Sequence, residues 1–252
     1  MKTIVLNNIK IVDTDIKKSL LMIDKQINNK IKSYICFCEG NILSKTVSCK
    51  KLVDVLNKAG MVFPDGIIMK LIAKAKGYKT LHRISGPTFM LKAFEYGQKQ
   101  NWRHFLYGST DEVLKKLEKK FTEQYPNIQI VGKFSPPFRD LTYEEELEVK
   151  NMIESCNPDL LWVGLGGPKQ EYWMNDHLNK IDVPIMLGVG AAFDFHSGNK
   201  LWAPKFIRKI GMEWLFRMLT GGRNTFSRNI KCVSVVSLIL ITTALSNFVL
   251  FS

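Results

Sequence analysis

Apolar residues along the chain form short runs that alternate with longer stretches of helical spacing. The short runs are rich in β-branched and aromatic residues and predict strands at 3–6, 34–37, 61–63, 103–107, 128–131, 160–163 and 185–189. The longer stretches predict helices at 14–27, 42–58, 66–76, 87–100, 110–123, 142–155, 168–180 and 205–219. Strands separated by helices of this length indicate βαβ units. We therefore expect an α/β fold with a mainly parallel sheet flanked by helices.

The distribution of charge changes near residue 199. Residues 200–231 contain eight lysines and arginines and one acid, whereas residues 232–252 carry no charged side chain. We therefore expect a core at 1–198 and a basic, amphipathic C-terminal appendage with an apolar tail at 199–252. Such a helix favours contact with a membrane surface, and the alternative is packing on the core with a solvated basic face. Serines and threonines in the tail weaken a transmembrane interpretation.

The net charge of +13 favours polyanionic partners: nucleic acid, an anionic membrane or phosphorylated substrates. The basic residues concentrate beside an apolar tail instead of an aromatic platform, so we do not expect nucleic acid as the partner. The five cysteines lack C-x-x-C spacing, which argues against a zinc site or a disulfide framework and suits a reducing cytoplasm. Cys36 and Cys38 are expected to be buried free thiols on one face of a strand.

Asp13 and Asp15 form a D-x-D pair, a pattern that holds a metal ion in some sugar-nucleotide enzymes. Both lie at the start of a predicted helix, where acids usually cap the helix or interact with its dipole. We therefore expect caps, and no metal or other cofactor.

Small or conformationally special residues follow five of the predicted strands, at 64–66, 108–110, 135–138, 164–168 and 190–195. Ligands of parallel sheets bind beyond the carboxyl ends of the strands, so this clustering indicates one large ligand in contact with several loops. The turn after residue 163 lacks the third glycine of a dinucleotide fingerprint, because Lys169 stands there. It is either a tight connection or a cradle whose backbone N–H groups face a phosphate. Asp65 is either a general base or the cap of the following helix.

Five stretches in this order resemble the WecG/TagA/CpsF glycosyltransferase family: FPDG at 63–66, YGS at 107–109, GKFSPPFR at 132–139, PDLLWVGLGGPKQEYW at 158–173, and GVGAAFDF at 188–195 followed by AP at 203–204 and GMEWLFR at 211–217. The resemblance covers about residues 30–230. It implies a Rossmann-like core and an appendage that helps membrane association. It also implies inverting, metal-independent transfer of N-acetylmannosamine or a related hexose from a UDP donor to a polyprenyl-diphosphate-linked sugar, in teichoic acid, common antigen, capsule or exopolysaccharide synthesis.

The resemblance also implies roles for individual residues. Asp65 matches the family's proposed general base, Gln170 a polar active-site residue, and Arg83 an arginine that precedes a glycine. The appendage arginines that fall where the diphosphate would be reached are Arg217, Arg223 and Arg228. The positions that fall in stretches around the substrate are Gly108, Ser109, Pro136, Phe138, Gly164, Gly166, Val189, Gly190 and Asp194.

Two positions depart from the family pattern. Residues 38–41 (CEGN) stand where the family commonly has Asn-x-x-His, and Thr88 falls in a stretch where the family has Gly-x-Asp-Leu. These departures leave open a catalytically impaired homologue that binds nucleotide sugars. Because Asp65 and Gln170 are present, we favour an active enzyme at the cytoplasmic face of the membrane, held peripherally. The donor sugar, the acceptor and the oligomeric state, homo-oligomers included, stay open.

Overall fold

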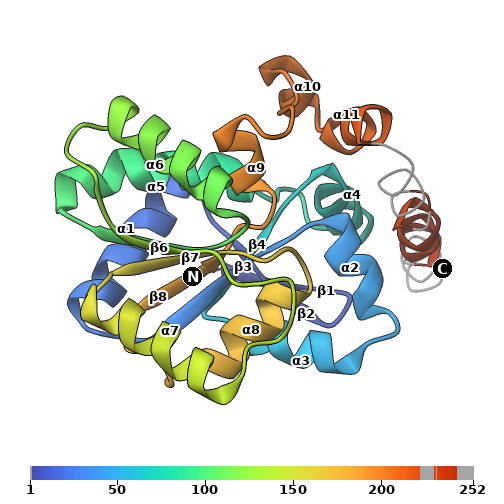
Figure 1. The fold of residues 1–252 in the computed structure, drawn as a ribbon. Coiled ribbons are helices and arrows are strands. Elements are labelled where there is room, and N and C mark those ends of the chain that lie inside the picture. Colours follow the sequence, from blue (N-terminus) through green and yellow to red (C-terminus); the bar gives the residue numbers. More distant parts are fainter. Residues whose placement is uncertain (1, 222–229, 231, 243–252) are drawn as a thin grey trace.

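The protein is seen in a computed structural model that describes residues 2–221, 230 and 232–242. Within these residues, a six-stranded parallel sheet forms the centre of the molecule, with strand order β4-β3-β8-β7-β5-β6 (Figure 1). Its strands are β3 (Ser33–Cys38), β4 (Met61–Pro64), β5 (Arg103–Gly108), β6 (Gln129–Phe134), β7 (Leu160–Gly164) and β8 (Ile185–Gly188). All five strand pairings are parallel. The predicted α/β class with a mainly parallel sheet is therefore confirmed.

Helices cover both faces of the sheet (Figure 1). The helices are α1 (Ile16–Asn28), α2 (Gly40–Thr46), α3 (Lys50–Lys58), α4 (Ile67–Ala75), α5 (Gly86–Gln100), α6 (Asp111–Gln124), α7 (Tyr143–Ser155), α8 (Lys169–His177), α9 (Ala192–Ser197), α10 (Lys205–Ile210) and α11 (Glu213–Thr220). The core beside α1, α5 and α6 is separate from the core beside α2, α3, α7 and α8. The sheet is therefore buried on both faces, as parallel sheets generally are.

Strand β3 illustrates how the sequence divides between these two cores. All six of its residues are buried, and successive side chains point to opposite faces. Tyr34, Cys36 and Cys38 join the core beside α3 and α8, whereas Ile35 and Phe37 join the core beside α1 and α5. Both cysteines are free thiols, as expected from their alternation.

The N-terminal segment departs from the predicted sheet. The strand expected at 3–6 exists as β1 (Lys2–Leu6), but it pairs antiparallel with β2 (Ile9–Asp13) in a separate hairpin. The prediction missed β2 as a strand. Its signal was the Asn7-Asn8 turn, in which both residues have positive φ (46° and 64°), the conformation of a two-residue hairpin loop.

Two predicted helices are each divided in two, and one short helix, α9, was not predicted. The segment 42–58 forms α2 and α3, with Cys49 in extended conformation between them. The segment 205–219 forms α10 and α11, because Gly211 adopts a φ of 80°. A side chain at Gly211 would also collide with Ile67 of α4, at 2.7 Å from its Cβ. Glycine there lets the chain turn and lie close to the core.

The apolar stripe of the predicted amphipathic helix is partly exposed to solvent; it consists of Phe206, Ile207, Ile210, Met212, Trp214, Leu215 and Met218. Phe206 and Ile210 of this stripe are exposed, as is the neighbouring Leu219, and α10 has no buried residue. Ile207 and Arg208 are half-buried and the other residues of α10 are exposed, so α10 packs on its neighbours only in part. Residues 232–242 form a further helix, and none of the helices within the described residues has the length and hydropathy needed to cross a bilayer. The boundary near residue 199 stays a prediction.

Candidate functional site

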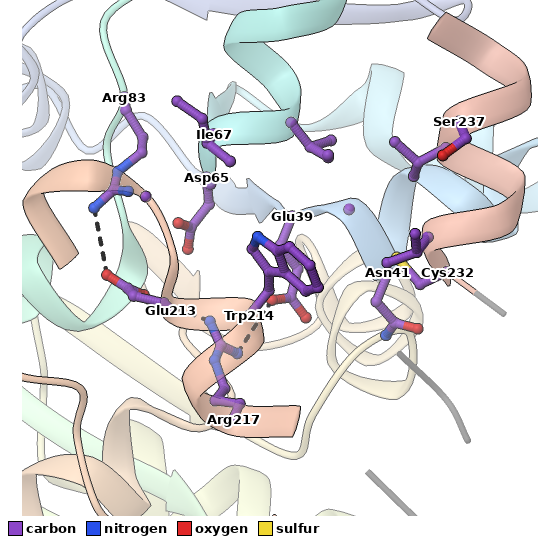
Figure 2. A pocket seen from close by; sticks show the side chains of 16 residues that line it. Glu39, Asn41, Asp65, Ile67, Arg83, Glu213, Trp214, Arg217, Cys232 and Ser237 are labelled. Atoms are coloured by element: carbon purple, nitrogen blue, oxygen red, sulfur yellow. Dashed lines mark hydrogen bonds and ion pairs between the residues drawn. The ribbon is translucent and has the colours of Figure 1, made fainter. Parts of the chain in front are cut away.

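A pocket of about 140 Å³ lies beyond the carboxyl ends of β3 and β4 (Figure 2). Its walls come from the segment after β3, the start of α4, the loop before α5, helix α11 and the helix at 232–242. The core and the C-terminal segment thus enclose it together. This is the edge of a parallel sheet at which ligands are expected.

Asp65 lies inside this pocket, directly after β4. Its backbone N–H donates to the carbonyl oxygen of Cys38 at 2.9 Å, which continues the pairing of β3 and β4. Its carboxylate Oδ2 accepts a hydrogen bond of 3.2 Å from the backbone N–H of Gly86. The N-cap of α4 is Gly66, without a side-chain hydrogen bond, so Asp65 is not the cap of that helix.

The surroundings of Asp65 favour its protonated form. Burial, followed by the negative charges of Glu39 and Glu213, raises the pKa of Asp65 to about 7, although Arg217 and the Gly86 N–H act in the opposite direction. A carboxyl with a pKa near neutrality can accept a proton more readily than an ordinary aspartate while it is still substantially ionised at pH 7. This is the property expected of a general base.

Two arginines share the pocket with three carboxylates. Arg83 Nη2 lies 3.3 Å from Glu213 Oε1, and Arg217 Nη2 lies 3.6 Å from Glu213 Oε2. Arg217 Nη1 in turn lies 3.3 Å from Glu39 Oε2. An ion-pair chain therefore crosses the pocket from the loop before α5, through α11, to the end of β3 (Figure 2). The predicted residues Asp65, Arg83 and Arg217 are thus brought together.

The remaining wall of the pocket is apolar. It is formed by Ile67 and Ile68 of α4, Trp214 of α11, and Val233 and Val236 of the helix at 232–242. The pocket thus combines a charged floor with a hydrocarbon wall. An amphiphilic ligand with a charged head and a lipid chain fits such a combination.

Gln170 does not line this pocket. Its Oε1 accepts a hydrogen bond of 3.1 Å from the Gly166 N–H, and its Nε2 donates to the Gly188 carbonyl oxygen at 2.9 Å and to Glu171 Oε1 at 3.0 Å. The side chain therefore joins the turn after β7 to the end of β8. Gly190 lies beside it, because a Cβ there would be 3.3 Å from Gln170 Oε1.

Trp173 packs helix α8 against strand β5, and the neighbouring Glu171 is buried. Glu171 is completely buried, its Oε2 has no hydrogen-bond partner among the described residues, and burial raises its pKa to about 7. Trp173 stacks between Tyr107 and His177, at centroid distances of 4.4 and 4.1 Å. Both side chains thus contribute to packing at the edge of the sheet that carries the pocket.

The glycines after β5 and β7 allow these strands to approach closely. Gly108 has a φ of 119°, and a Cβ there would lie 2.7 Å from the carbonyl carbon of Gly164. A Cβ at Gly164 would itself collide with Phe193 of α9. Ser109, with a φ of 59°, accepts a hydrogen bond at its carbonyl oxygen from Ser135 Oγ. These predicted positions therefore meet at one edge of the sheet.

The other predicted substrate positions are more dispersed. Val189 is buried, Pro136 is half-buried and Phe138 is 96% exposed. The Asp194 carboxylate accepts a hydrogen bond from Asn199 Nδ2 at 3.1 Å and pairs with Lys200. Gly166 has a φ of 78°, and a Cβ there would meet no atom within 4 Å, so this glycine borders open space. Arg223 and Arg228 lie outside the described residues.

Sequence reasoning did not assign Glu39, Glu213 and Trp214 to the site. Glu39 could have been found from its position two residues after the strand predicted at 34–37. Glu213 and Trp214 lie in the GMEWLFR stretch of the resemblance, but only the fold brings α11, and these two residues with it, to the pocket.

The Asp13-Thr14-Asp15 motif lies away from this pocket. Asp15 is the N-cap of α1 and accepts a hydrogen bond of 2.8 Å from the Lys18 N–H, which confirms the expected cap. Asp13 is the last residue of β2, so the expectation of a cap is wrong for it; it accepts from the His82 backbone N–H at 3.1 Å and lies 3.0 Å from His82 Nδ1. Among the residues that the structure describes, no cluster of three or more potential metal ligands occurs.

Known proteins resemble this chain over most of its length. The glycosyl transferase WecG/TagA/CpsF family matches residues 4–247. A Bacillus subtilis (strain 168) protein is 27% identical over 220 residues, which cover 87% of this chain and 84% of the relative. A Staphylococcus aureus (strain NCTC 8325 / PS 47) protein is 28% identical over 186 residues, 74% of this chain and 71% of the relative. Both are named N-acetylglucosaminyldiphosphoundecaprenol N-acetyl-beta-D-mannosaminyltransferase.

The family match extends over nearly all of the chain, and it contains Asp65, Gln170 and the two pocket arginines. The resemblance found in the five ordered motifs is thereby confirmed. This chain belongs to the WecG/TagA/CpsF family of glycosyltransferases.

Proposed function

We propose that this protein is an inverting glycosyltransferase that moves a hexose or N-acetylhexosamine from a UDP-sugar to a polyprenyl-diphosphate-linked sugar. The observation that carries the proposal is the position of Asp65: a carboxyl with a pKa of about 7 lies in a pocket with two arginines and an apolar wall. The names of the relatives add N-acetylmannosamine as the first donor sugar to test and a diphosphate-linked N-acetylglucosamine as the first acceptor.

The pocket supports binding of the acceptor. Its diphosphate carries negative charge that Arg83 and Arg217 can pair with, and guanidinium groups bind phosphate oxygens with two parallel hydrogen bonds. The polyprenyl chain would lie against the apolar wall that contains Ile67, Trp214 and Val233. Arg223 and Arg228 remain candidates for further contacts with the diphosphate.

The edge formed by β5, β7 and β8 supports binding of the donor. The positions Gly108, Ser109, Gly164, Gly166 and Gly190 lie at this edge, and at Gly166 a Cβ would meet no described atom within 4 Å, so a nucleotide can come close to the backbone there. The donor would then lie beside the acceptor pocket along one edge of the sheet.

In the reaction, the Asp65 carboxylate takes the proton of the acceptor sugar hydroxyl. The hydroxyl oxygen forms a bond to the anomeric carbon of the donor sugar from the face opposite UDP. The bond from that carbon to the β-phosphate oxygen breaks, and UDP leaves with the electron pair. General-base catalysis of this kind contributes about 10²–10⁴-fold to a rate. Arginines and backbone N–H groups would stabilise the charge on UDP without a metal ion.

We place the protein at the cytoplasmic face of the membrane as a peripheral protein. Exposed apolar side chains of the C-terminal segment support this placement: Phe206, Ile210, Leu219, Leu238 and Ile241. Basic residues on the same segment, such as Lys205 and Lys209, would face anionic lipid headgroups.

The test is to incubate the protein with a panel of UDP-sugars and a lipid-diphosphate-linked N-acetylglucosamine and to measure UDP release. Transfer with at least one UDP-sugar is expected. UDP binding without turnover on any acceptor would instead favour the impaired homologue suggested by Asn41 and Thr88. In the structure, Asn41 lines the pocket and Thr88 accepts a hydrogen bond from Ser85 Oγ at 2.9 Å.

A further inference from the structure

Glu39 is an acid of the pocket that the proposed mechanism does not use. It follows β3 directly, and Asp65 follows β4 directly. These strands are neighbours in parallel register, with Cys38 opposite Pro64. Glu39 and Asp65 therefore occupy equivalent positions at the ends of adjacent strands, and both line the same pocket (Figure 2).

The Glu39 carboxylate also contacts the C-terminal segment. Its Oε2 is 3.3 Å from Arg217 Nη1, across 178 positions of sequence. The Glu39 side chain is 38% exposed and that of Arg217 is 30% exposed, so the pair is partly open to solvent. Glu39 is the N-cap of α2 but makes no side-chain capping bond there. Its carboxylate is therefore directed to the pocket and does not serve its own helix.

We infer that Glu39 is a positioning residue of the transferase site: its carboxylate holds Arg217 over the pocket and places a second negative charge beside Asp65. This inference rests on the proposed function for its catalytic consequence. Arg217 bound to Glu39 is kept where it can receive the substrate diphosphate. The negative charge beside Asp65 makes that carboxyl a better proton acceptor.

The charges around Asp65 have opposing effects. Glu39 and Glu213 disfavour its ionised form, whereas Arg217 and the Gly86 N–H favour it. Arg83 belongs to the same ion-pair chain, and the pocket lining adds one further titratable group, Cys232. Of the two glutamates, Glu39 has the larger effect on the pKa of Asp65.

Removal of the Glu39 charge therefore has a predictable sign. Glu39→Gln keeps the shape of the side chain but removes its charge, and loss of that negative charge lowers the pKa of Asp65. Arg217 keeps its ion pair with Glu213, at 3.6 Å, and so stays in the pocket. The acidic limb of kcat/KM should move to lower pH, by up to about one pH unit, with a modest fall of the plateau because the base is weaker. Glu39→Asp retains the charge, so the acidic limb of its kcat/KM profile should lie close to that of the wild type.

A second measurement does not depend on activity. The full-length protein is labelled with ¹³Cγ-aspartate, the Asp65 resonance is identified by its absence in Asp65→Asn, and its titration is followed by NMR. The midpoint should fall in Glu39→Gln and stay close to wild type in Glu95→Gln, a matched change of an acid that pairs with Lys92 on the surface of α5. Circular dichroism checks that each variant is folded.

The outcomes separate the two proposals. A shift of both the Asp65 titration and the pH limb in Glu39→Gln supports the inference. An unchanged Asp65 titration in folded Glu39→Gln overturns it, whatever the activity. A wild-type protein that transfers no sugar, although Glu39→Gln still shifts the Asp65 titration, contradicts the proposed function and leaves the electrostatic role of Glu39 supported.

Discussion

Gln170 Nε2 donates a hydrogen bond of 2.9 Å to the carbonyl oxygen of Gly188 and so ties helix α8 to the end of strand β8. The same side chain accepts a hydrogen bond from the Gly166 N–H. Two loops at the ligand-binding edge of the sheet thus depend on one buried amide. Gln170 supports the site from beneath the turn that follows β7, outside the pocket that contains Asp65.

The first prediction concerns this amide. Gln170→Met has a similar volume but leaves the Gly166 N–H and the Gly188 carbonyl without that partner, which should lower the free energy of unfolding by about 1–3 kcal/mol. Urea unfolding followed by circular dichroism measures the change. The control is Gln98→Met, which makes the same substitution at a glutamine of helix α5. Equal stability of the two variants would contradict a structural role for Gln170.

The second prediction concerns the buried carboxyl of Glu171. Its pKa in the folded protein is raised to about 7, so the folded state binds the proton more tightly than the unfolded chain does. Stability should therefore fall as the pH rises from the unfolded-state value of 4.5 to about 7. Glu171→Gln removes this loss and still offers Oε1 to Gln170.

The free energy of unfolding of Glu171→Gln minus that of the wild type should thus be larger at pH 8 than at pH 4.5, by at most about 3 kcal/mol. Thermal unfolding across this pH range provides the measurement. Glu123→Gln changes an exposed acid on α6 and serves as the reference. If the difference in unfolding free energy between wild type and Glu171→Gln did not change with pH, Glu171 would not be protonated preferentially in the folded state.

The third prediction separates close packing from backbone strain. Gly108→Ala should destabilise the protein by more than about 2 kcal/mol, the scale of overpacking plus a left-handed backbone, because its Cβ meets the Gly164 backbone at 2.7 Å. Gly77→Ala also has a positive φ, 85°, but no atom within 4 Å, so it should cost only about 1 kcal/mol. Chemical denaturation of both variants tests the ranking. If Gly77→Ala were the more damaging change, the close approach of β5 and β7 would be wrong.

The fourth prediction concerns the exposed apolar side chains of the C-terminal segment. The double variant Phe206→Ser and Leu219→Ser should reduce sedimentation of the protein with anionic vesicles by several-fold, because each side chain contributes burial of about 1–3 kcal/mol in a membrane interface. The control is Ile31→Ser, which changes an exposed apolar residue just before β3, at the amino end of that strand and so away from the pocket. Vesicle binding that falls equally in both proteins would exclude α10 and α11 as the contact.

The sequence predicted much of the core because its signals are local. Short apolar runs placed all six strands of the sheet, and the helices predicted at 110–123 and 142–155 exist as α6 and α7, with Thr110 and Thr142 as their side-chain caps. Asp65 was found because a carboxylate directly after a strand is at the ligand-binding edge. The glycine turns at that edge were found for the same reason.

The missed features depend on contacts between distant residues. Helix α11 brings Glu213, together with the predicted Arg217, to Asp65, and only the fold reveals that Glu213 pairs with Arg83, 130 positions away. The division of 205–219 at Gly211 has a local signal, but the collision with Ile67 that explains the glycine does not. The buried position of Gln170 was also not evident, because a polar residue in the first turn of a helix is usually exposed.

The most direct test of the account is the transfer rate of Asp65→Asn, measured by UDP release with a lipid-diphosphate-linked acceptor, together with UDP affinity by calorimetry. The substitution keeps the shape and an oxygen that can accept from the Gly86 N–H, but it removes the base. We predict a loss of transfer of at least about 10²-fold with nearly unchanged UDP binding. Transfer at the wild-type rate by Asp65→Asn would contradict the assignment of Asp65 as the base.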